Sequence, residues 1–381
     1  MSFCSQAQYT VWCWVAKLQL NLDIDVVMTN NTAVKTHRFL ASKIRKMMVM
    51  LLAVGTVTTT LADDTQSSFN ALSSSTGDCL QPFYREVPPL LNKDSLKKHN
   101  YALCMTDFSV MYSGVSKTPL WSAEYLSPKN FQQQVKREDN FHEESRVQLE
   151  HRALLSDYRA SGYDRGHMAP SGDMRNRAAQ NDSFSLVNII PQAQKNNQEV
   201  WRKLEEAVRA IVTKQQQEVY VLTGPLFEGQ RLKTIGQGVF VPTAVYKAIY
   251  VPQQGVIGAY YAPNDDSQQV EVLSVCALEE KLGINLFPQL SEQQKRNIYH
   301  LPLSAPQVKA KQDIAYSHWD GKSQCAVEAT TDEIQAQQHQ FTLNSAEPME
   351  SQFPPIAEPL QHAMIQQLVN ALLQYFLQLL R

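Results

Sequence analysis

The order of extended and helical segments in the middle of the chain constrains the fold more than any other feature. Segments rich in β-branched and aromatic residues, bounded by Gly or Pro, predict strands over residues 101–113, 219–227, 239–250 and 256–261. The short break between the last two predicts a β-hairpin. Residues 196–214 carry apolar side chains at helical spacing with charged residues between them. Because helices and strands do not alternate regularly, the pattern predicts an α+β domain.

Composition limits the classes of protein to which the chain can belong. It has 381 residues, of which 43% are hydrophobic and 19% charged, so it can bury a sizeable core. No apolar run reaches the ~18 residues that a membrane-spanning helix needs, which argues against an integral membrane protein. The 35 basic and 37 acidic residues nearly cancel, yet residues 129–214 hold 14 basic side chains against 12 acidic ones. A locally basic groove is therefore compatible with the sequence.

The N-terminal region contains the three parts of a secretory signal. A basic segment at residues 43–46 precedes an apolar run over residues 47–57, and the small residues Thr60 and Ala62 follow at the −3 and −1 positions. This pattern predicts a signal peptide over residues 47–62, preceded by an extension over residues 1–46, and a periplasmic or secreted product. Because a signal peptide should begin near the first residue, one alternative is that the start codon is assigned too early and that Met47 or Met48 lies close to the true start. Another is a core helix within an N-terminal extension.

The cysteines agree with export. Six are present, and Cys4 and Cys13 precede the predicted signal. The remaining four contain no C-x-x-C pair, which disfavours a zinc ribbon or a thioredoxin-like site. In an exported chain they predict two disulfides, for which three pairings exist. Proximity in the sequence favours Cys79 with Cys104 and Cys276 with Cys325, and four buried free thiols are the alternative.

The C-terminal region changes composition at residue 328. From there Gln, Thr, Ser and Pro dominate, which predicts a linker after a folded domain over residues 63–327. Further on, Ile365, Leu368, Leu372 and Phe376 recur at helical spacing, so residues 328–381 are expected to be a linker and an amphipathic helix. We expect this helix to dock on the body or to form a homo-oligomer, because it lacks the basic polar face of a membrane-surface helix.

Two short motifs carry the residues suited to catalysis. In Asp164-Arg165-Gly166-His167, glycine permits a tight backbone and imidazole is the side chain best suited to accept a proton near neutral pH. Alone, this motif is equally consistent with a structural histidine beside an Arg-Asp ion pair. A second cluster follows about thirty residues later: Asn-x-x-Pro-Gln at 188–192, Asn-x-x-x-Trp at 197–201, and Leu-Glu at 204–205.

Together, in this order and at this spacing, the motifs resemble the DNA/RNA non-specific endonucleases, the ββα-metal nuclease family. The resemblance is dense over residues 164–209 and extends over roughly residues 79–290. Residues 103–124 resemble the early strands of exported bacterial members, and residues 137–141 resemble the Arg-containing segment that precedes the His motif. The resemblance implies a ββα-metal nuclease core on a mixed, largely antiparallel sheet with flanking helices.

The resemblance also implies a role for individual residues. His167 would be the general base that activates water for attack on phosphorus, and Asn188 would support the geometry of the site. Arg137 and Arg165 would face the phosphate, for which the planar guanidinium is well suited.

For the metal, the resemblance implies Mg²⁺ or Mn²⁺ with Asn197 as its one direct protein ligand and Glu205 holding metal-bound waters. One protein oxygen is chemically reasonable, because Mg²⁺ keeps several of its waters. On a regular helix the two residues would lie ~12 Å apart along the axis, so a water bridge is favoured over co-ligation.

The expected function is a metal-dependent, sugar-nonspecific endonuclease that hydrolyses DNA and RNA. No helix-turn-helix, zinc-finger or basic-zipper pattern appears, so sequence-specific binding is not supported. Two alternatives are a catalytically silent nucleic-acid-binding relative and a metal-dependent phosphodiesterase acting on small substrates. The presence of His167, Asn197 and Glu205 together argues against the silent relative.

Overall fold

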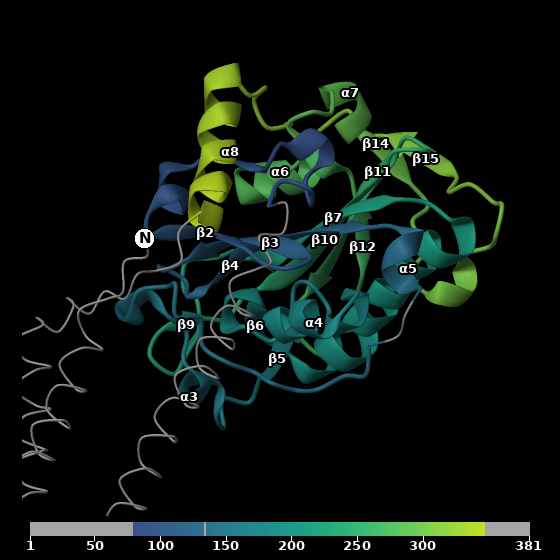
Figure 1. The fold of residues 1–381 in the computed structure, drawn as a ribbon. Coiled ribbons are helices and arrows are strands. Elements are labelled where there is room, and N and C mark those ends of the chain that lie inside the picture. Colours follow the sequence, from purple (N-terminus) through teal and green to yellow (C-terminus); the bar gives the residue numbers. More distant parts are fainter. Residues whose placement is uncertain (1–78, 133–134, 347–381) are drawn as a thin grey trace, which may run out of the picture. The chain divides into compact units, whose positions relative to one another are not determined.

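The centre of the molecule is a seven-stranded sheet (Figure 1). The computed structural model describes residues 79–132 and 135–346, with side chains up to residue 342. The strands run in the order β12 (Glu271–Leu273), β11 (Val256–Pro263), β10 (Ala244–Val251), β7 (Val219–Leu226), β4 (Thr118–Leu126), β3 (Phe108–Ser113) and β2 (Asn100–Cys104). Every neighbouring pair is antiparallel, where a mixed, largely antiparallel sheet was expected.

The predicted strands are present, with two interruptions. The hairpin between β10 and β11 is confirmed, and Val251 pairs with Val256 at its closed end. The segment predicted over residues 101–113 is two strands, β2 and β3, which pair with each other. The segment predicted over residues 239–250 divides into β9 (Val239–Phe240) and β10. Pro242 lies at this break, where its missing N–H cannot join a strand ladder.

Smaller elements complete the described part of the chain. The two-stranded sheets are β1 (Leu90–Leu91) with β13 (Ile284–Asn285), β5 (Asp164–His167) with β6 (Ile189–Gln192), β8 (Thr234–Ile235) with β9, and β14 (Asn297–Tyr299) with β15 (Tyr316–Trp319). The helices are α3 (Leu155–Tyr158), α4 (Arg177–Ser183), α5 (Arg202–Gln215), α6 (Val275–Leu282), α7 (Glu292–Lys295) and α8 (Thr331–Ala346). Short 3-10 turns lie at Tyr84–Glu86, Asp94–Lys97, Pro128–Phe131, Leu149–His151, Ser171–Asp173, Leu186–Asn188 and Ala305–Gln307. None of the helices described is long and apolar enough to cross a membrane.

Helix α5 covers one face of the large sheet. Leu204, Val208 and Ile211 of the helix belong to one buried cluster with Val221 and Ile249 of the sheet. This is the apolar face that the spacing of residues 196–214 predicts. The first turn differs from the prediction, because residues Asn196–Trp201 form a π-helical turn before α5 begins. Such turns are frequent at functional sites.

Helices α6 and α8 cover the opposite face, and Figure 1 shows them on the side of the sheet away from α4, β5 and β6. Phe341 of α8 is fully buried, with its ring centre 5.3 Å from that of Phe83 and 5.6 Å from that of Trp121. The predicted linker is therefore wrong for residues 331–346, because α8 supplies a core side chain. The amphipathic helix predicted around residues 365–380, the signal peptide and residues 1–46 lie outside the described residues.

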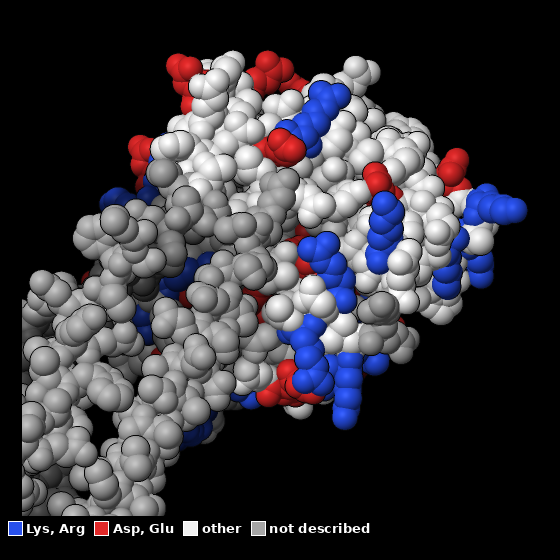
Figure 2. Space-filling model, in the orientation of Figure 1, with Lys and Arg blue, Asp and Glu red and all other residues white. Residues whose placement is uncertain are grey.

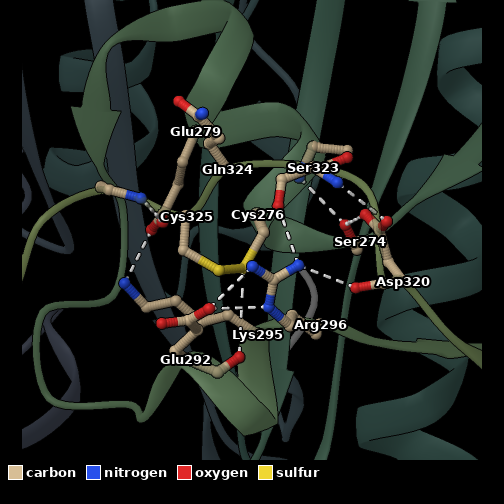
Figure 3. The surroundings of a disulfide bond; sticks show 12 residues. Ser274, Cys276, Glu279, Glu292, Lys295, Arg296, Asp320, Ser323, Gln324 and Cys325 are labelled. Atoms are coloured by element: carbon tan, nitrogen blue, oxygen red, sulfur yellow. Dashed lines mark hydrogen bonds and ion pairs between the residues drawn. A yellow bond between two sulfur atoms is a disulfide. The ribbon is translucent and has the colours of Figure 1, made fainter.

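Both predicted disulfides are present, Cys79–Cys104 and Cys276–Cys325. The second joins α6 to the segment after β15 (Figure 3). Beside it, the buried Lys295 Nζ donates to Glu279 Oε1 at 2.9 Å and to Asn285 Oδ1 at 2.6 Å. The disulfide and this ion pair join the elements that follow β12 to one another.

Replacing Phe341 tests whether α8 belongs to the folded body. We expect Phe341→Ala to lower the free energy of unfolding by about 3–5 kcal/mol, because it removes a ring packed between Phe83 and Trp121. Urea unfolding measures the effect, and Gln340→Ala, an exposed change on the same helix, is the control. Equal stabilities of the two variants would contradict the assignment of α8 to the core.

Candidate active site

Strands β5 and β6 bring the two sequence motifs together. They pair antiparallel from Asp164 opposite Gln192 to His167 opposite Ile189. Gly166 faces Gln192 so closely that a Cβ at this position would lie 2.6 Å from the Gln192 Cβ. The glycine between Arg165 and His167 is therefore required by the close approach of the two strands. The π-helical turn and α5 follow β6 along the chain, which completes a strand–strand–helix unit.

Asn188 anchors the chain on either side of this unit. Its Oδ1 accepts hydrogen bonds from Ser122 Oγ (2.8 Å) and Ala169 N (2.9 Å). Its Nδ2 donates to Ala169 O (2.8 Å) and Ser183 O (2.9 Å). The side chain is fully buried, and these four bonds use its whole capacity. Asn188 thus joins the backbone at Ala169 to β4 and to the end of α4, and the supporting role expected for it stays a prediction.

The other five predicted residues line one cavity of about 660 Å³: Arg137, Arg165, His167, Asn197 and Glu205. They come from the segment before α3, from β5, from the π-helical turn and from α5. Residues that are about seventy positions apart in the sequence therefore face the same space. The structure brings together the residues that the motifs singled out.

His167 has an environment that keeps its imidazole neutral. Its ring lies 5.4 Å from that of Phe141 and 4.9 Å, edge to face, from that of Phe184. Nε2 is buried and has no hydrogen-bond partner among the residues described. Burial, with the nearby positive charge of Arg137, lowers the pKa of His167 to about 3. At neutral pH the ring is therefore in the form that accepts a proton, although it is a weaker base than a free histidine.

The arginines carry positive charge at the wall of the cavity. Arg165 lies 4.0 Å over the ring of Phe141 and has no carboxylate partner in the described part of the chain. Arg137 pairs with Asp139 at 2.6 Å, and its Nη1 donates to Ser171 Oγ at 3.3 Å. Guanidinium groups held in this way are suited to contact phosphate oxygens.

Asn197 and Glu205 offer oxygen atoms that fit a hard divalent cation. Asn197 Nδ2 donates to Asp164 Oδ2 at 2.9 Å, and its Oδ1 has no hydrogen-bond partner in residues 79–132 and 135–346. The Glu205 carboxyl group likewise has no ion pair or hydrogen bond within those ranges. The same ranges hold no cluster of three His, Cys, Asp or Glu residues that could bind a metal. A cation here would keep most of its waters, as Mg²⁺ does.

The titration of Glu205 differs from that of an ordinary glutamate. Burial raises the pKa of Glu205 to about 7, and the attraction of Lys247 opposes this rise. Asp173 raises the pKa further, whereas Arg209 and Arg137 lower it. Near neutral pH this carboxyl group therefore ionises less readily than an ordinary glutamate when no cation is present.

Several residues around the site lie outside the sequence motifs. Arg209 lies four positions after Glu205 on α5, lines the same cavity and pairs with the buried Asp173 at 2.6 Å. The helical spacing of Glu205 and Arg209 was a usable signal. Glu124 and Lys247 gave no such signal, because each lies within a strand-forming segment. Both are buried, and neither Glu124 oxygen has a hydrogen-bond partner in the part of the chain described.

The charge of the surface agrees with a local basic region. Figure 2 shows lysine and arginine side chains over the part of this face where Figure 1 draws α4, α5 and β5. The sequence between residues 129 and 214, which contains these elements, has the basic excess noted above. Such a region attracts a polyanion even though the whole chain carries a formal charge of −2.

Comparisons with known proteins give a consistent result. The family model described as DNA/RNA non-specific endonuclease matches residues 89–293. Endonuclease G, mitochondrial, from Bos taurus is 32% identical over 211 residues, which are 50% of this chain and 68% of that protein. Nuclease EXOG, mitochondrial, from Danio rerio is 34% identical over 212 residues, which are 50% of this chain and 61% of that protein. The crystal structure of the EndoG/EndoGI complex aligns with a TM-score of 0.48 and 25% identity, covering 58% of this chain and 94% of that chain.

The titration of Glu205 leads to a prediction on metal binding. We expect the apparent affinity for Mg²⁺ to rise as the pH increases towards 7 and then to level off, because the carboxyl group is protonated below its raised pKa. Calorimetric titration with Mg²⁺ at pH values from 5.5 to 8.5, about one unit apart, measures this. Glu205→Gln should bind more weakly and lose the pH dependence. Glu206→Gln, which alters the neighbouring carboxylate of the same cavity, should keep it.

Proposed function

Because the chain belongs to the DNA/RNA non-specific endonuclease family, we propose that it uses a divalent metal ion to hydrolyse phosphodiester bonds in both DNA and RNA. One observation carries the proposal: His167, Asn197 and Glu205 line the same cavity as Arg137 and Arg165. A base, oxygen atoms that can hold a hydrated metal ion, and guanidinium groups are suited to the hydrolysis of an anionic diester.

His167 acts as the general base in this proposal. His167 lines the cavity and its ring is neutral near pH 7, so it can accept the proton of a water that attacks phosphorus. Arg165 and Arg137 offset the negative charge that develops on the phosphoryl oxygens. Asn197 would hold Mg²⁺ or Mn²⁺ directly and Glu205 would hold it through water, and the bound ion would supply Lewis-acid stabilisation of the phosphate and of the leaving oxygen.

The cavity favours contacts with phosphate over contacts with bases. Of its lining residues, Arg137, Arg165, Arg202 and Arg209 are positively charged, and contacts of guanidinium with phosphate do not depend on sequence. Contacts of this kind support cleavage of both DNA and RNA without sequence preference.

Export to the periplasm or the medium is a separate proposal. The two disulfides support it, because disulfides persist in oxidising compartments. The predicted signal peptide at residues 47–62 supports it independently. N-terminal sequencing of the product expressed from Met47 decides the matter, and retention of residues 47–62 in a cytoplasmic product would reject it.

Replacing His167 tests the catalytic role. We expect His167→Ala to lower the turnover of plasmid DNA in Mg²⁺ by roughly 10²–10⁴-fold, which is the usual contribution of a general base. His300→Ala, an exposed histidine that lines neither this cavity nor its neighbour, should leave turnover unchanged. Thermal unfolding is followed in parallel. A fall in melting temperature that accounts for the lost activity would assign His167 a structural role instead.

Replacing Asn197 tests the metal ligand. We expect Asn197→Ala to abolish Mg²⁺-dependent cleavage, and excess metal should not restore it. Gln198→Ala is the matched control, because Gln198 Nε2 also donates to Asp164 Oδ2, at 2.8 Å, yet is given no ligand role. A metal titration of both variants separates loss of the ligand from loss of the bond to Asp164. Full rescue of Asn197→Ala by metal would argue against direct coordination.

A further inference from the structure

A second cavity of about 600 Å³ lies beside the first. Arg165 lines both, so the two spaces are neighbours along β5. The second cavity is walled by three segments, namely residues 139–141, α3 with Arg159, and residues 163–165. Its volume lies within the range of ~300–1,000 Å³ that is usual for sites that bind small organic groups.

The walls of this second cavity combine aromatic surface with free cations. Phe141, Tyr163 and Leu155, the last 39% exposed, supply apolar surface. Arg159 is exposed and has no ion pair or side-chain hydrogen bond within the described ranges. Arg165 lies over the Phe141 ring and has no carboxylate partner there either. Two unpaired guanidinium groups beside aromatic rings fit a group that is both anionic and flat.

The acidic residues of the wall do not cancel this character. Asp139 already pairs with Arg137 at 2.6 Å. Asp164 Oδ2 accepts hydrogen bonds from Asn197 and Gln198 at 2.9 and 2.8 Å. Arg159 and Arg165 therefore keep their charge available to a ligand, and a phosphate oxygen is the acceptor that they match best.

We propose that this second cavity binds a nucleotide of the substrate strand that lies beyond the cleaved bond, with Arg159 contacting its phosphate and Tyr163 stacking on its base. The proposal rests on the proposed function, because the cleaved phosphodiester must lie in the first cavity. Because Arg165 lines both cavities, a single nucleic-acid strand can occupy both of them. Since stacking on a side chain requires an exposed base face, the site favours unpaired strands over intact duplex.

Binding of single-stranded DNA oligonucleotides to the full chain, measured by fluorescence anisotropy in chelator, tests this without cleavage. We expect Arg159→Ala and Tyr163→Ala each to raise the Kd about tenfold, which is typical of a lost base-stacking or phosphate contact. Arg231→Ala and Tyr316→Ala are the matched controls, because both residues are exposed and line neither cavity. The controls should bind like the unchanged chain.

Moving one abasic nucleotide along the oligonucleotide locates the stacked base. In the unchanged chain, an abasic nucleotide at one position should raise the Kd. In Tyr163→Ala, an abasic nucleotide at the same position should raise the Kd no further. Melting curves identify any variant that fails to fold, and the exposed Arg159 gives the test independently of the half-buried Tyr163. Variants that bind as tightly as their controls would overturn the proposal.

Cleavage in Mg²⁺ separates this proposal from the proposed function. Arg159→Ala should raise KM about tenfold and leave kcat unchanged, because the residue binds the strand away from the reacting bond. A fall in kcat with unchanged KM would place Arg159 in the first cavity and reject the second site. If the unchanged chain fails to cleave while the anisotropy pattern holds, hydrolysis is rejected and the nucleotide site stands.

Discussion

The rest of the site depends on the buried side chain of Asn188. Its four hydrogen bonds join Ser122 of β4, both backbone groups of Ala169, and the last residue of α4. The backbone carbonyl of Asn188 also accepts from Met168 N at 2.9 Å. The chain that leaves His167 is thereby fixed to the large sheet on one side and to α4 on the other. The general base proposed at His167 needs such fixed geometry, because proton transfer depends on the position of its nitrogen.

A buried polar layer beneath the cavity controls its charge. Lys247 Nζ lies between the strands and donates to Thr223 Oγ1 at 2.7 Å, while burial raises the pKa of Glu124 well above its usual value. The charges of Lys247 and Arg209 act on both Glu124 and Glu205. The sheet therefore does more than support α5, because the charge of Lys247 opposes the rise that burial causes in the pKa of Glu205.

The features that could be predicted from the sequence are those that depend on a local pattern of residues. The β10–β11 hairpin, the apolar face of α5 and the Asp164–His167 motif each depend on neighbouring residues, and each is present. What the sequence did not show depends on contacts between distant segments. Phe341 becomes a core residue only because Phe83 and Trp121 leave room for it, and its polar neighbours predicted a linker. The π-helical turn and the polar layer of Glu124 and Lys247 likewise have no signature in residue spacing.

The pKa shifts of His167 and Glu205 act on stability in opposite directions. The pKa of His167 falls from 6.5 to about 3, so folding favours its neutral ring, and this contribution is lost as the pH falls below about 6.5. The pKa of Glu205 rises from 4.5 to about 7, so folding favours its protonated form, and stability decreases as the pH rises towards about 7. At neutral pH the ring of His167, the proposed base, is therefore neutral, whereas ionisation of the Glu205 carboxyl group lowers stability. A cation at Asn197 and Glu205 would offset that cost, which couples assembly of the metal site to the ionisation of Glu205.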